Sequence, residues 1–319
     1  MSEPTPEALL WNLTRGALTT RALAIVSELG VADALAAGPR PAVDVASELG
    51  ADPETLHRFL RALASEGVFA EEEPGVFRNT AASESLRLGG PWNDFAHLFG
   101  GVFYRTLADL DASGEPTFAR LYGTDFWSWL AAHPDERASF DRAMGQGQEG
   151  RIERLQQVEW RGDETVVDVG GGNGSLLVEL LKLEPGLRGI VFDLPETVRD
   201  EAALGKLGIE FVEGSFFERV PEGEVYILGT ILHDWDDEAA AAILLTIRAA
   251  APDESRLLVI DAVVQPGNEP GGVKWLDLLM LAFAGGKERN EPQWRKLLAA
   301  GGFEPVRFHA FLIEAAPCR

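Results

Sequence analysis

A glycine-rich turn follows a short apolar run near the middle of the chain. The run, Thr165–Val169, is rich in β-branched residues, carries Asp168, and ends at a group of glycines that includes Gly170 and Gly172. Such a run is typical of a buried parallel strand, and glycines let the main chain turn tightly and approach a ligand closely. A helix is expected to begin near Ser175, so its free N–H groups would point toward the turn. The pattern predicts a ligand-binding turn.

Three further apolar runs end on polar or aromatic side chains that could contact the same ligand. About 20 residues after the turn, a second run ends at Asp193, where an acid could accept hydrogen bonds from two ribose hydroxyls. A third run ends at Ser215 and Phe216, and a fourth leads into His233. Ligands of open α/β sheets bind outside the carboxyl ends of the strands, so we expect all these residues to face one crevice.

The residues around the turn favour a cationic nucleoside over a nucleotide. No Lys follows the glycines, as a triphosphate-binding loop would require. A dinucleotide loop needs glycine or alanine as its third small residue, but the count from Gly170 reaches Ser175 and the count from Gly172 reaches Leu177. Asp168, directly before the glycines, suits a positive ligand better than a phosphate. S-adenosylmethionine carries a sulfonium and an ammonium and has no phosphate, so we predict it as the cofactor.

Five motifs resemble the signature set of small-molecule O-methyltransferases, the plant caffeate and flavonoid enzymes and their bacterial relatives in aromatic polyketide pathways. The motifs, in family order, are D-V-G-G-G-N-G (168–174), V-F-D-L-P-E-T-V (191–198), G-S-F-F (214–217), I-L-H-D-W-D-D-E (231–238) and G-G-K-E-R (285–289). The resemblance covers nearly the whole chain. It implies a cofactor site formed by Asp168, Gly170, Gly172, Asp193, Leu194, Ser215, Phe216 and Gly229. Two departures stand out: plant members carry Asp-Met at Ser215-Phe216, and the family often has Lys or Ser at Gly229.

His233 is the predicted general base. A phenol has a pKa of about 10 and a histidine about 6.5, so full proton transfer before reaction would be uphill by about 5 kcal/mol. Removing the proton as the methyl group arrives avoids this intermediate. A base needs an acceptor on its other ring nitrogen, and the candidates are Asp261 and Glu288. Asp261 is a charge inside an apolar run, which destabilises the fold unless the charge is paired. The family has Glu at both positions, so Asp261 is one methylene shorter.

Asp234, beside His233, is a further catalytic candidate. Asp234 and Asp237 have an alternative interpretation as the N-cap and a first-turn acid of the next helix. The acids at 234, 236 and 237 resemble a Mg²⁺ cluster, but a helix start explains them more simply, and no metal is predicted.

Aromatic and methionine side chains from two segments are predicted to line the acceptor pocket. The resemblance points to Trp127, Phe140 and Met144, and we add Met280 and Phe283 from a later apolar helix. Ordinary core packing is the competing interpretation for each. The sequence does not identify the acceptor itself.

Alternation of strands and helices after residue 164 predicts a doubly wound, Rossmann-like parallel sheet. Residues 256–264, which include Asp261, are expected to form a buried strand, and the final strands could form an antiparallel edge. Asn290 is a plausible helix cap. We expect residues 105–319 to hold a helical connector and this methyltransferase domain.

Residues 1–104 are expected to form an α-helical, winged-helix domain. Apolar stripes within 7–36 exceed what one small domain needs, and a partner chain could cover them. Residues 42–80 show two helices, the second capped by Asp52, and a hairpin turning at Pro74-Gly75. Three acids at 71–73 on the hairpin would repel DNA phosphates, so a structural module is favoured over DNA binding. The resemblance implies a homodimer formed through this domain.

Composition limits the possible partners and compartments. The chain has 319 residues, 46% of them hydrophobic and 25% charged, with a formal net charge of −23. So acidic a chain lacks the basic face that nucleic acid or an anionic membrane requires. The single Cys318 excludes an intrachain disulfide. Neither a leader peptide nor a membrane-spanning run is evident, and we expect a cytoplasmic protein.

Three rival functions differ in their expected features. A relative that binds S-adenosylmethionine but performs a hydroxylation or a pericyclic step would often lose the base, so His233 argues against it. A winged-helix transcription factor is disfavoured by its acidic hairpin. An NAD-dependent reductase is disfavoured by the imperfect dinucleotide loop and by the H-D-W sequence at 233–235. A phenol-directed O-methyltransferase is therefore the leading hypothesis.

Overall fold

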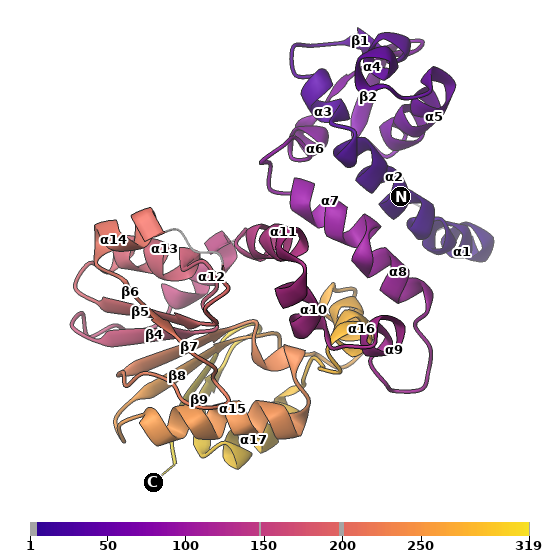
Figure 1. Cartoon of the computed structure of the whole chain (residues 1–319). Coiled ribbons are helices and arrows are strands. Elements are labelled where there is room, and N and C mark those ends of the chain that lie inside the picture. The colour runs from indigo at the N-terminus through magenta and orange to yellow at the C-terminus, as the bar shows by residue number, and fades with distance from the viewer. Residues whose placement is uncertain (1–4, 147, 198–200, 319) are drawn as a thin grey trace. The chain divides into compact units, whose positions relative to one another are not determined.

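The computed structural model describes residues 5–146, 148–197 and 201–318, and divides into two compact units between Ala108 and Asp109 (Figure 1). Residues 1–4 and Val198, the last residue of the second motif, lie outside the described residues. No helix in the described ranges is long and apolar enough to cross a membrane.

The first unit combines eight helices with a small antiparallel sheet in its described part. Its elements are α1 (Pro6–Thr14), α2 (Gly16–Glu28), α3 (Val31–Ala34), β1 (Arg40–Pro41), α4 (Ala42–Leu49), α5 (Pro53–Ala64), β2 (Phe69–Glu73), β3 (Val76–Asn79), α6 (Ala81–Glu84), α7 (Asn93–Gly100) and α8 (Val102–Ala108). The predicted hairpin is confirmed, since β2 and β3 pair antiparallel and β1 adds to β3.

Local signals explain how the first unit folds. Asp52 caps α5 as predicted, because its carboxylate accepts from the Thr55 N–H at 2.8 Å. Leu56, Leu60 and Leu63 then form one buried face of α5 in the core of the unit. By contrast, α1 buries none of its residues, and its large apolar side chains are exposed: Leu9, Leu10, Trp11 and Leu13.

The second unit contains the site and is built around one sheet. Its helices are α9 (Thr117–Tyr122), α10 (Phe126–Ala132), α11 (Pro134–Met144), α12 (Gln148–Leu155), α13 (Ser175–Leu183), α14 (Glu201–Leu207), α15 (Asp237–Ala250), α16 (Val273–Phe283), α17 (Glu291–Ala300) and the 3₁₀ helix η1 (Leu232–Asp234). Its strands are β4 (Thr165–Val169), β5 (Arg188–Asp193), β6 (Glu210–Glu213), β7 (Val225–Gly229), β8 (Arg256–Ile260), β9 (Phe303–Phe308) and β10 (Ile313–Pro317).

The sheet has the order β6-β5-β4-β7-β8-β10-β9. The first five strands in this order are parallel, whereas β10 is antiparallel to both β8 and β9, which confirms the expected antiparallel edge. The chain runs outward from β4 to β6 and then returns to β7 beside β4. This reversal makes β4 and β7 the topological switch point, where ligands of such sheets bind.

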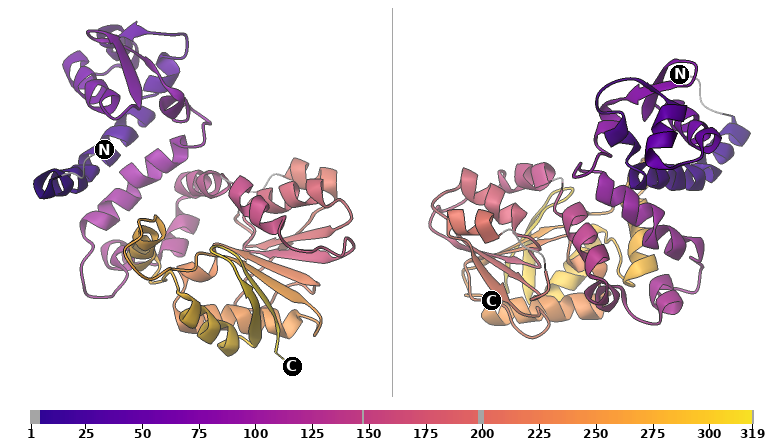
Figure 2. Two further views of the ribbon diagram at one scale, coloured as in Figure 1. Left: turned by 180° about the vertical axis from the view of Figure 1, so that it is seen from behind. Right: turned by 45° about the horizontal axis from the view of Figure 1, so that its top comes forward.

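Helices cover both faces of the sheet. One core packs α12, α13 and α14 against the strands, with Val166, Val191 and Ile227 at its centre. The other core packs α15 and α17, which lie together on one side of the sheet in the left view of Figure 2. The predicted Rossmann-like, doubly wound fold is thus confirmed.

Two local predictions were wrong. The strand β8 ends at Ile260, so Asp261 follows the strand instead of lying inside it. The antiparallel partner β10 pairs no further than Ile313 with Val259, which leaves the next residues outside the ladder. Asp234 is not a helix cap, because it lies in η1 and the carboxylate of Asp236 caps α15 through the Ala239 N–H. Asn290 caps α17 as expected.

Candidate active site

The carboxyl ends of β4 to β8 bring the predicted cofactor and catalytic residues to one edge of the sheet. Parallel pairing in register places the ends of β5, β4 and β7 side by side, as in the pair Asp168 and Ile227. Asp193 ends β5, Gly229 ends β7 and Asp261 directly follows β8. Alternation of strands and helices is therefore enough to gather residues distant in sequence.

Asp193 and the glycine turn after β4 are joined by hydrogen bonds. The Asp193 carboxylate accepts from the Gly172 N–H at 2.7 Å, from its neighbour Leu194 N–H at 2.7 Å and from the Thr197 hydroxyl at 2.8 Å. Gly170 and Gly172 have φ of 72° and 58°, a region that L side chains rarely adopt. The turn is thus tied to Asp193 before any ligand binds.

Asp168 is a buried carboxyl group with an unpaired oxygen. Its Oδ2 has no hydrogen-bond partner in the described part of the chain, and the residue is 2% exposed. Burial raises the pKa of Asp168 to about 7, against the opposing effect of the Arg151 cation. Buried polar atoms are normally hydrogen-bonded, so an orphan oxygen here indicates a ligand donor or cation.

The exit of β7 is strained at Thr230. Its φ of 57° is unusual for a β-branched residue, and such outliers concentrate at functional sites. The Thr230 hydroxyl accepts from Arg151 Nη2 at 2.9 Å and donates to the Gly229 carbonyl at 2.6 Å. Among the described residues, only Leu176 comes within 4 Å of a Cβ placed on Gly229, at 3.8 Å, so this position is surrounded by open space.

His233 lies in η1 among three carboxyl groups. Its Nδ1 is 2.7 Å from Glu288 Oε1 and 3.9 Å from Asp261 Oδ1, so Glu288 supplies the hydrogen bond and Asp261 only a nearby charge. On the other ring nitrogen, Nε2 is 3.6 Å from Asp234 Oδ1, beyond hydrogen-bonding distance. The side chain of His233 is 9% exposed, and those of Asp261 and Glu288 are fully buried.

The three carboxyl groups make His233 a strongly basic imidazole. Burial lowers the pKa of His233, but Asp261, Asp234 and Glu288 outweigh burial and raise it to about 10. Burial raises the pKa of Asp261 to about 7 and of Asp234 to about 6, despite the favourable charge of His233. Both oxygens of Asp261 and the Oε2 of Glu288 lack hydrogen-bond partners among the described residues. Orphan, perturbed acids in one cluster are typical of a functional site.

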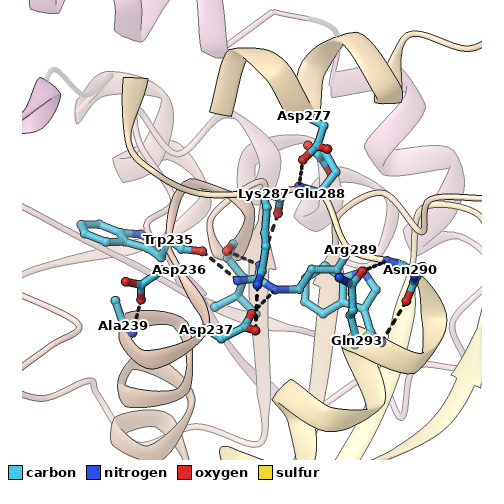
Figure 3. Close-up of polar contacts among 12 residues, drawn as sticks. Trp235, Asp236, Asp237, Ala239, Asp277, Lys287, Glu288, Arg289, Asn290 and Gln293 are labelled. Carbon is cyan, nitrogen blue, oxygen red and sulfur yellow. Dashed lines mark hydrogen bonds and ion pairs between the residues drawn. The ribbon is translucent and has the colours of Figure 1, made fainter. Parts of the chain in front are cut away.

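The segment 285–289 packs directly against the His233 turn. The Lys287 N–H donates to the His233 carbonyl at 2.9 Å, and a Cβ on Gly286 would overlap that same carbonyl oxygen. Glu288 is held in turn by its own N–H, which donates to Asp277 Oδ1 at 2.8 Å (Figure 3). Only glycine permits this approach, which brings Glu288 within reach of His233.

Aromatic rings continue from the cofactor end toward the predicted acceptor pocket. Trp127 lies nearly parallel to Trp235, with ring centroids 6.5 Å apart, and edge-on to Phe140 at 5.7 Å. Phe216 contacts the other side of this group, since its centroid is 6.0 Å from Trp235. The indole N–H of Trp127 is buried without a partner in the described ranges, so a ligand could accept from it.

The remaining predicted residues divide between this aromatic group and its margins. Phe283 is buried and meets Phe126 edge-on at 5.3 Å. Met280 lies one turn earlier on α16 and Met144 ends α11, both half-buried. Ser215 accepts from the Phe217 N–H at 3.3 Å, in the turn after β6.

Several residues of the site escaped the sequence analysis. Trp235 was within a recognised motif, and its ring contacts could have been suspected from its place beside His233. The strain at Thr230 and the bond from Arg151 have no signature in local sequence, whereas Arg289 ends a recognised motif but was not named as a site residue. Among the described residues, no group of three or more His, Cys, Asp or Glu is arranged to hold a metal ion.

Family models match both parts of the chain. An O-methyltransferase domain matches residues 104–304, and an O-methyltransferase dimerisation domain matches residues 11–87. The chain therefore belongs to the O-methyltransferase family, whose members use S-adenosylmethionine.

Individual relatives agree over nearly the full length. The phenazine O-methyltransferase PhzM of Lysobacter antibioticus is 36% identical, with 97% of this chain and 96% of the relative covered. The crystal structure of LaPhzM has a TM-score of 0.91 at 35% identity, covering 98% of this chain and 99% of that chain. The structure of NcsB1, in complex with S-adenosyl-L-homocysteine and 1,4-dihydroxy-2-naphthoic acid, has a TM-score of 0.79 at 35% identity, covering 94% and 96%.

The chain is thus an S-adenosylmethionine-dependent O-methyltransferase, and the acceptors named for these relatives are small molecules. The residues fit this cofactor on structural grounds. The orphan Oδ2 of Asp168 is placed for a hydrogen-bond donor or cation, and a Cβ on Gly172 would meet no atom within 4 Å, so the turn is open above it.

Proposed function

We propose that His233 is the general base that takes the proton from a phenolic hydroxyl of a small aromatic acceptor. The observation that carries this proposal is the 2.7 Å contact between His233 Nδ1 and Glu288 Oε1. A carboxylate on Nδ1 fixes the tautomer and orientation of the ring and leaves Nε2 to receive the proton. S-adenosylmethionine supplies the electrophilic methyl group on its sulfonium.

The protonation state of His233 must change before it can act as a base. With a pKa of about 10, His233 holds a proton at neutral pH when the crevice is empty of other cations. A positive charge brought into the same crevice lowers that pKa, because like charges disfavour protonation. Asp261 and Asp234 lie 3.9 and 3.6 Å from the ring nitrogens, and their charges raise the pKa of His233. Their proposed role is to stabilise the imidazolium after proton transfer.

The proposed cofactor contacts follow the carboxyl ends of the strands. Asp193 keeps one free lone pair, on Oδ2, for a ribose hydroxyl, because three donors already hold it in place. Asp168 is the proposed contact for a donor or cation, Phe216 for a flat base, and Ser215, Leu194 and Gly229 line the space between. The φ values of Gly170 and Gly172 allow the main chain to approach the ligand.

The proposed acceptor is a flat aromatic molecule held among Trp127, Phe140, Met144, Met280 and Phe283. Ring contacts among Trp127, Phe140, Phe126 and Phe283 favour stacking against a planar ligand. The names of relatives support the class, since they include a phenazine and a 3-amino-4-hydroxybenzoate methyltransferase. A product of secondary metabolism is the substrate class we propose.

The first unit is the proposed homodimerisation domain. The exposed apolar side chains of α1 provide a surface that a second copy could cover, and the family model for this region is a dimerisation domain. The acidic β2 carries Glu71, Glu72 and Glu73, which supports a structural role for this winged-helix arrangement over DNA binding. The domain boundary we propose, between residues 104 and 105, lies within α8.

His233→Ala, with His57→Ala as a control in the first unit, tests the proposal. Probes are 1,4-dihydroxy-2-naphthoic acid and a panel of hydroxylated benzoates. Turnover of His233→Ala should fall by about 100-fold or more, the usual contribution of a general base. Calorimetric affinity for S-adenosylhomocysteine should stay within about twofold, because no cofactor contact is removed. Undiminished turnover in His233→Ala would contradict the base assignment.

A further inference from the structure

Arg289 is a buried cation whose side chain holds the turn that carries His233. It is fully buried, and its Nη1 donates to the Leu232 carbonyl at 2.7 Å. Its Nη2 donates to the Trp235 carbonyl at 2.7 Å (Figure 3). These two carbonyls lie on either side of His233 and Asp234. A planar guanidinium with several N–H donors can bridge two such acceptors at once, which an ammonium cannot do in a fixed plane.

The third arm of Arg289 is tied to the start of the next helix. Its Nε donates to Asp237 Oδ1 at 2.9 Å, and Lys287 Nζ bonds the other oxygen of Asp237 at 2.8 Å. Asp237 is in the first turn of α15, directly after the cap Asp236. The guanidinium thereby fixes the whole passage from η1 into α15.

Arg289 also connects with the segment that carries Asp261. The Arg289 carbonyl accepts from the Val264 N–H at 2.9 Å. Its guanidinium lies 5.4 Å from the ring centroid of Trp294, whose indole N–H donates to the Ala262 carbonyl at 3.0 Å. Glu288 is its direct neighbour in sequence. The segment with Glu288 and Arg289 therefore contacts the His233 turn through the Arg289 side chain and the segment after Asp261 through the Arg289 main chain.

We propose that Arg289 is a positioning residue for the reaction, which holds the His233 turn at the distance from Glu288 that lets Nδ1 and Oε1 bond. This inference rests on the proposed role of His233. Arg289 acts through the main chain of the turn and needs no contact with either substrate. Its buried charge also stabilises negative charge among the acids: burial raises the pKa of Asp261, and the cations His233 and Arg289 lower it.

The first test compares Arg289→Lys and Arg289→Met, with Arg295→Met as the matched control. Arg295 is an exposed residue of α17 that pairs with Glu291 and lies over Phe308. We expect kcat to fall by about 10- to 100-fold in Arg289→Met, as for loss of orientation of a general base. Arg289→Lys should recover part of this loss, since it keeps the charge but not the fork. KM for S-adenosylmethionine and affinity for S-adenosylhomocysteine should change by less than about twofold.

The second test measures the His233 ring itself and does not depend on activity. Full-length protein with ¹⁵N-labelled histidine is titrated by NMR, and the His233 signals are those missing from His233→Ala. In Arg289→Met the titration midpoint of His233 should move down toward the ordinary value, because the carboxylates that raise it are no longer held beside it. In Arg295→Met it should stay as in the wild type. A fall in kcat without this displacement would reduce Arg289 to a structural residue and overturn the proposal.

A third variant covers the case in which Arg289→Met does not fold. Asp237→Asn removes the exposed anchor of Arg289, and Glu238→Gln is an equal charge change on an exposed neighbour in the same helical turn. Asp237→Asn should lower the His233 midpoint in the same direction, with kcat reduced by about 3- to 10-fold. A wild-type midpoint in both Asp237→Asn and Arg289→Lys overturns the proposal.

A double variant separates failure of this inference from failure of the proposed function. In the His233→Ala background, Arg289→Met should reduce kcat by no more than about twofold, because residues that act as a unit are not additive. If His233→Ala keeps full turnover, the base assignment fails, and the NMR titration alone decides whether Arg289 positions the ring. If His233→Ala is inactive but both Arg289 variants titrate and turn over as wild type, only the present inference fails.

Discussion

The strands β4 and β8 carry a buried charge cluster at each end of the sheet, and the two clusters differ in their hydrogen bonding. At the amino ends, Glu164 precedes β4 and Arg256 begins β8, with Glu164 Oε1 2.5 Å from Arg256 Nη2 and Oε2 accepting from the Arg161 N–H at 2.7 Å. At the carboxyl ends, Asp168 and Asp261 are equally buried, yet Asp168 Oδ2 and both Asp261 oxygens lack protein partners in the described ranges.

This difference indicates that the cluster at the amino ends stabilises the fold, whereas the cluster at the carboxyl ends is suited to bind a ligand. A buried carboxylate with both oxygens bonded gains back much of its lost hydration, whereas an orphan oxygen leaves that loss uncompensated. Of these carboxyl groups, those with orphan oxygens lie at the edge proposed to bind the substrates, in keeping with the clustering of perturbed acids at functional sites. Satisfaction of hydrogen bonds, more than burial or charge, distinguishes the two ends.

Asp168→Asn should give the largest effect, on binding. Removing the charge should weaken the affinity for S-adenosylmethionine by about 30- to 100-fold, corresponding to loss of a charge-assisted hydrogen bond of about 2–3 kcal/mol. Because the folded pKa of Asp168 is raised to about 7, the folded state binds the proton more tightly, and the wild type loses stability as pH rises from about 4 to 7. Asp168→Asn should remove this loss. Calorimetry and urea unfolding at several pH values measure both effects.

The control for Asp168→Asn is Asp163→Asn, an exposed acid before the same strand. Wild-type affinity in Asp168→Asn would show that the orphan oxygen faces no ligand. It would contradict the inference that the charge cluster at the carboxyl ends of the strands serves ligand binding.

Glu164→Gln should show the opposite profile. The free energy of unfolding should fall by about 1–3 kcal/mol, because the charged hydrogen bond between the buried Glu164 and the part-buried Arg256 is lost. Turnover and affinity for S-adenosylhomocysteine should stay within about twofold of the wild type. Urea unfolding measures the first effect, with the exposed Glu222→Gln as the control. A fall in turnover without loss of stability would contradict the inference that the amino-end cluster serves stability and the carboxyl-end cluster serves the reaction.

Removing single acids around His233 should give a smaller effect, on pH dependence. The base must be neutral to accept a proton, so kcat should rise as pH rises through the pKa of His233. Glu288→Gln and Asp261→Asn each remove a charge that raises this pKa, so the midpoint of the rise should move to lower pH by about one unit, or about 1.4 kcal/mol. Steady-state rates between pH 6 and 10 measure the shift. The exposed Glu291→Gln is the control and should keep the wild-type midpoint. An unchanged or higher midpoint in Glu288→Gln and Asp261→Asn would show that these acids do not raise the pKa of His233.

Much of the fold and the cofactor edge could be predicted from local sequence. The β-branched run of β4, the glycines after it and the cap at Asp52 are signals carried by neighbouring residues, and all three appear where expected. Asp193, Gly229 and His233 lie at one edge of the sheet because the carboxyl ends of parallel strands meet there.

Other features depend on contacts between segments far apart in sequence. Asp261 was placed inside a strand because its neighbours are apolar, but β8 ends at Ile260, the last residue that pairs with β7, and its pairing with β10, some fifty residues later, stops at Val259. Choosing Glu288 over Asp261 as the acceptor for His233 required the distances of 2.7 and 3.9 Å. Arg289 binds main-chain carbonyls, which every residue possesses. No pattern of side chains in the sequence therefore predicts its hydrogen-bond acceptors.

The glycine at 286 has a consequence for redesign. The separation of the segments carrying His233 and Glu288 is set by main-chain contact, through the Lys287 N–H and the absent Cβ of Gly286, and not by the two side chains that meet there. We therefore expect that the proposed catalytic pair can be exchanged for other reactive groups while these main-chain contacts are kept. The contact between the His233 turn and the segment at Gly286 is therefore a suitable site for the design of a new active site.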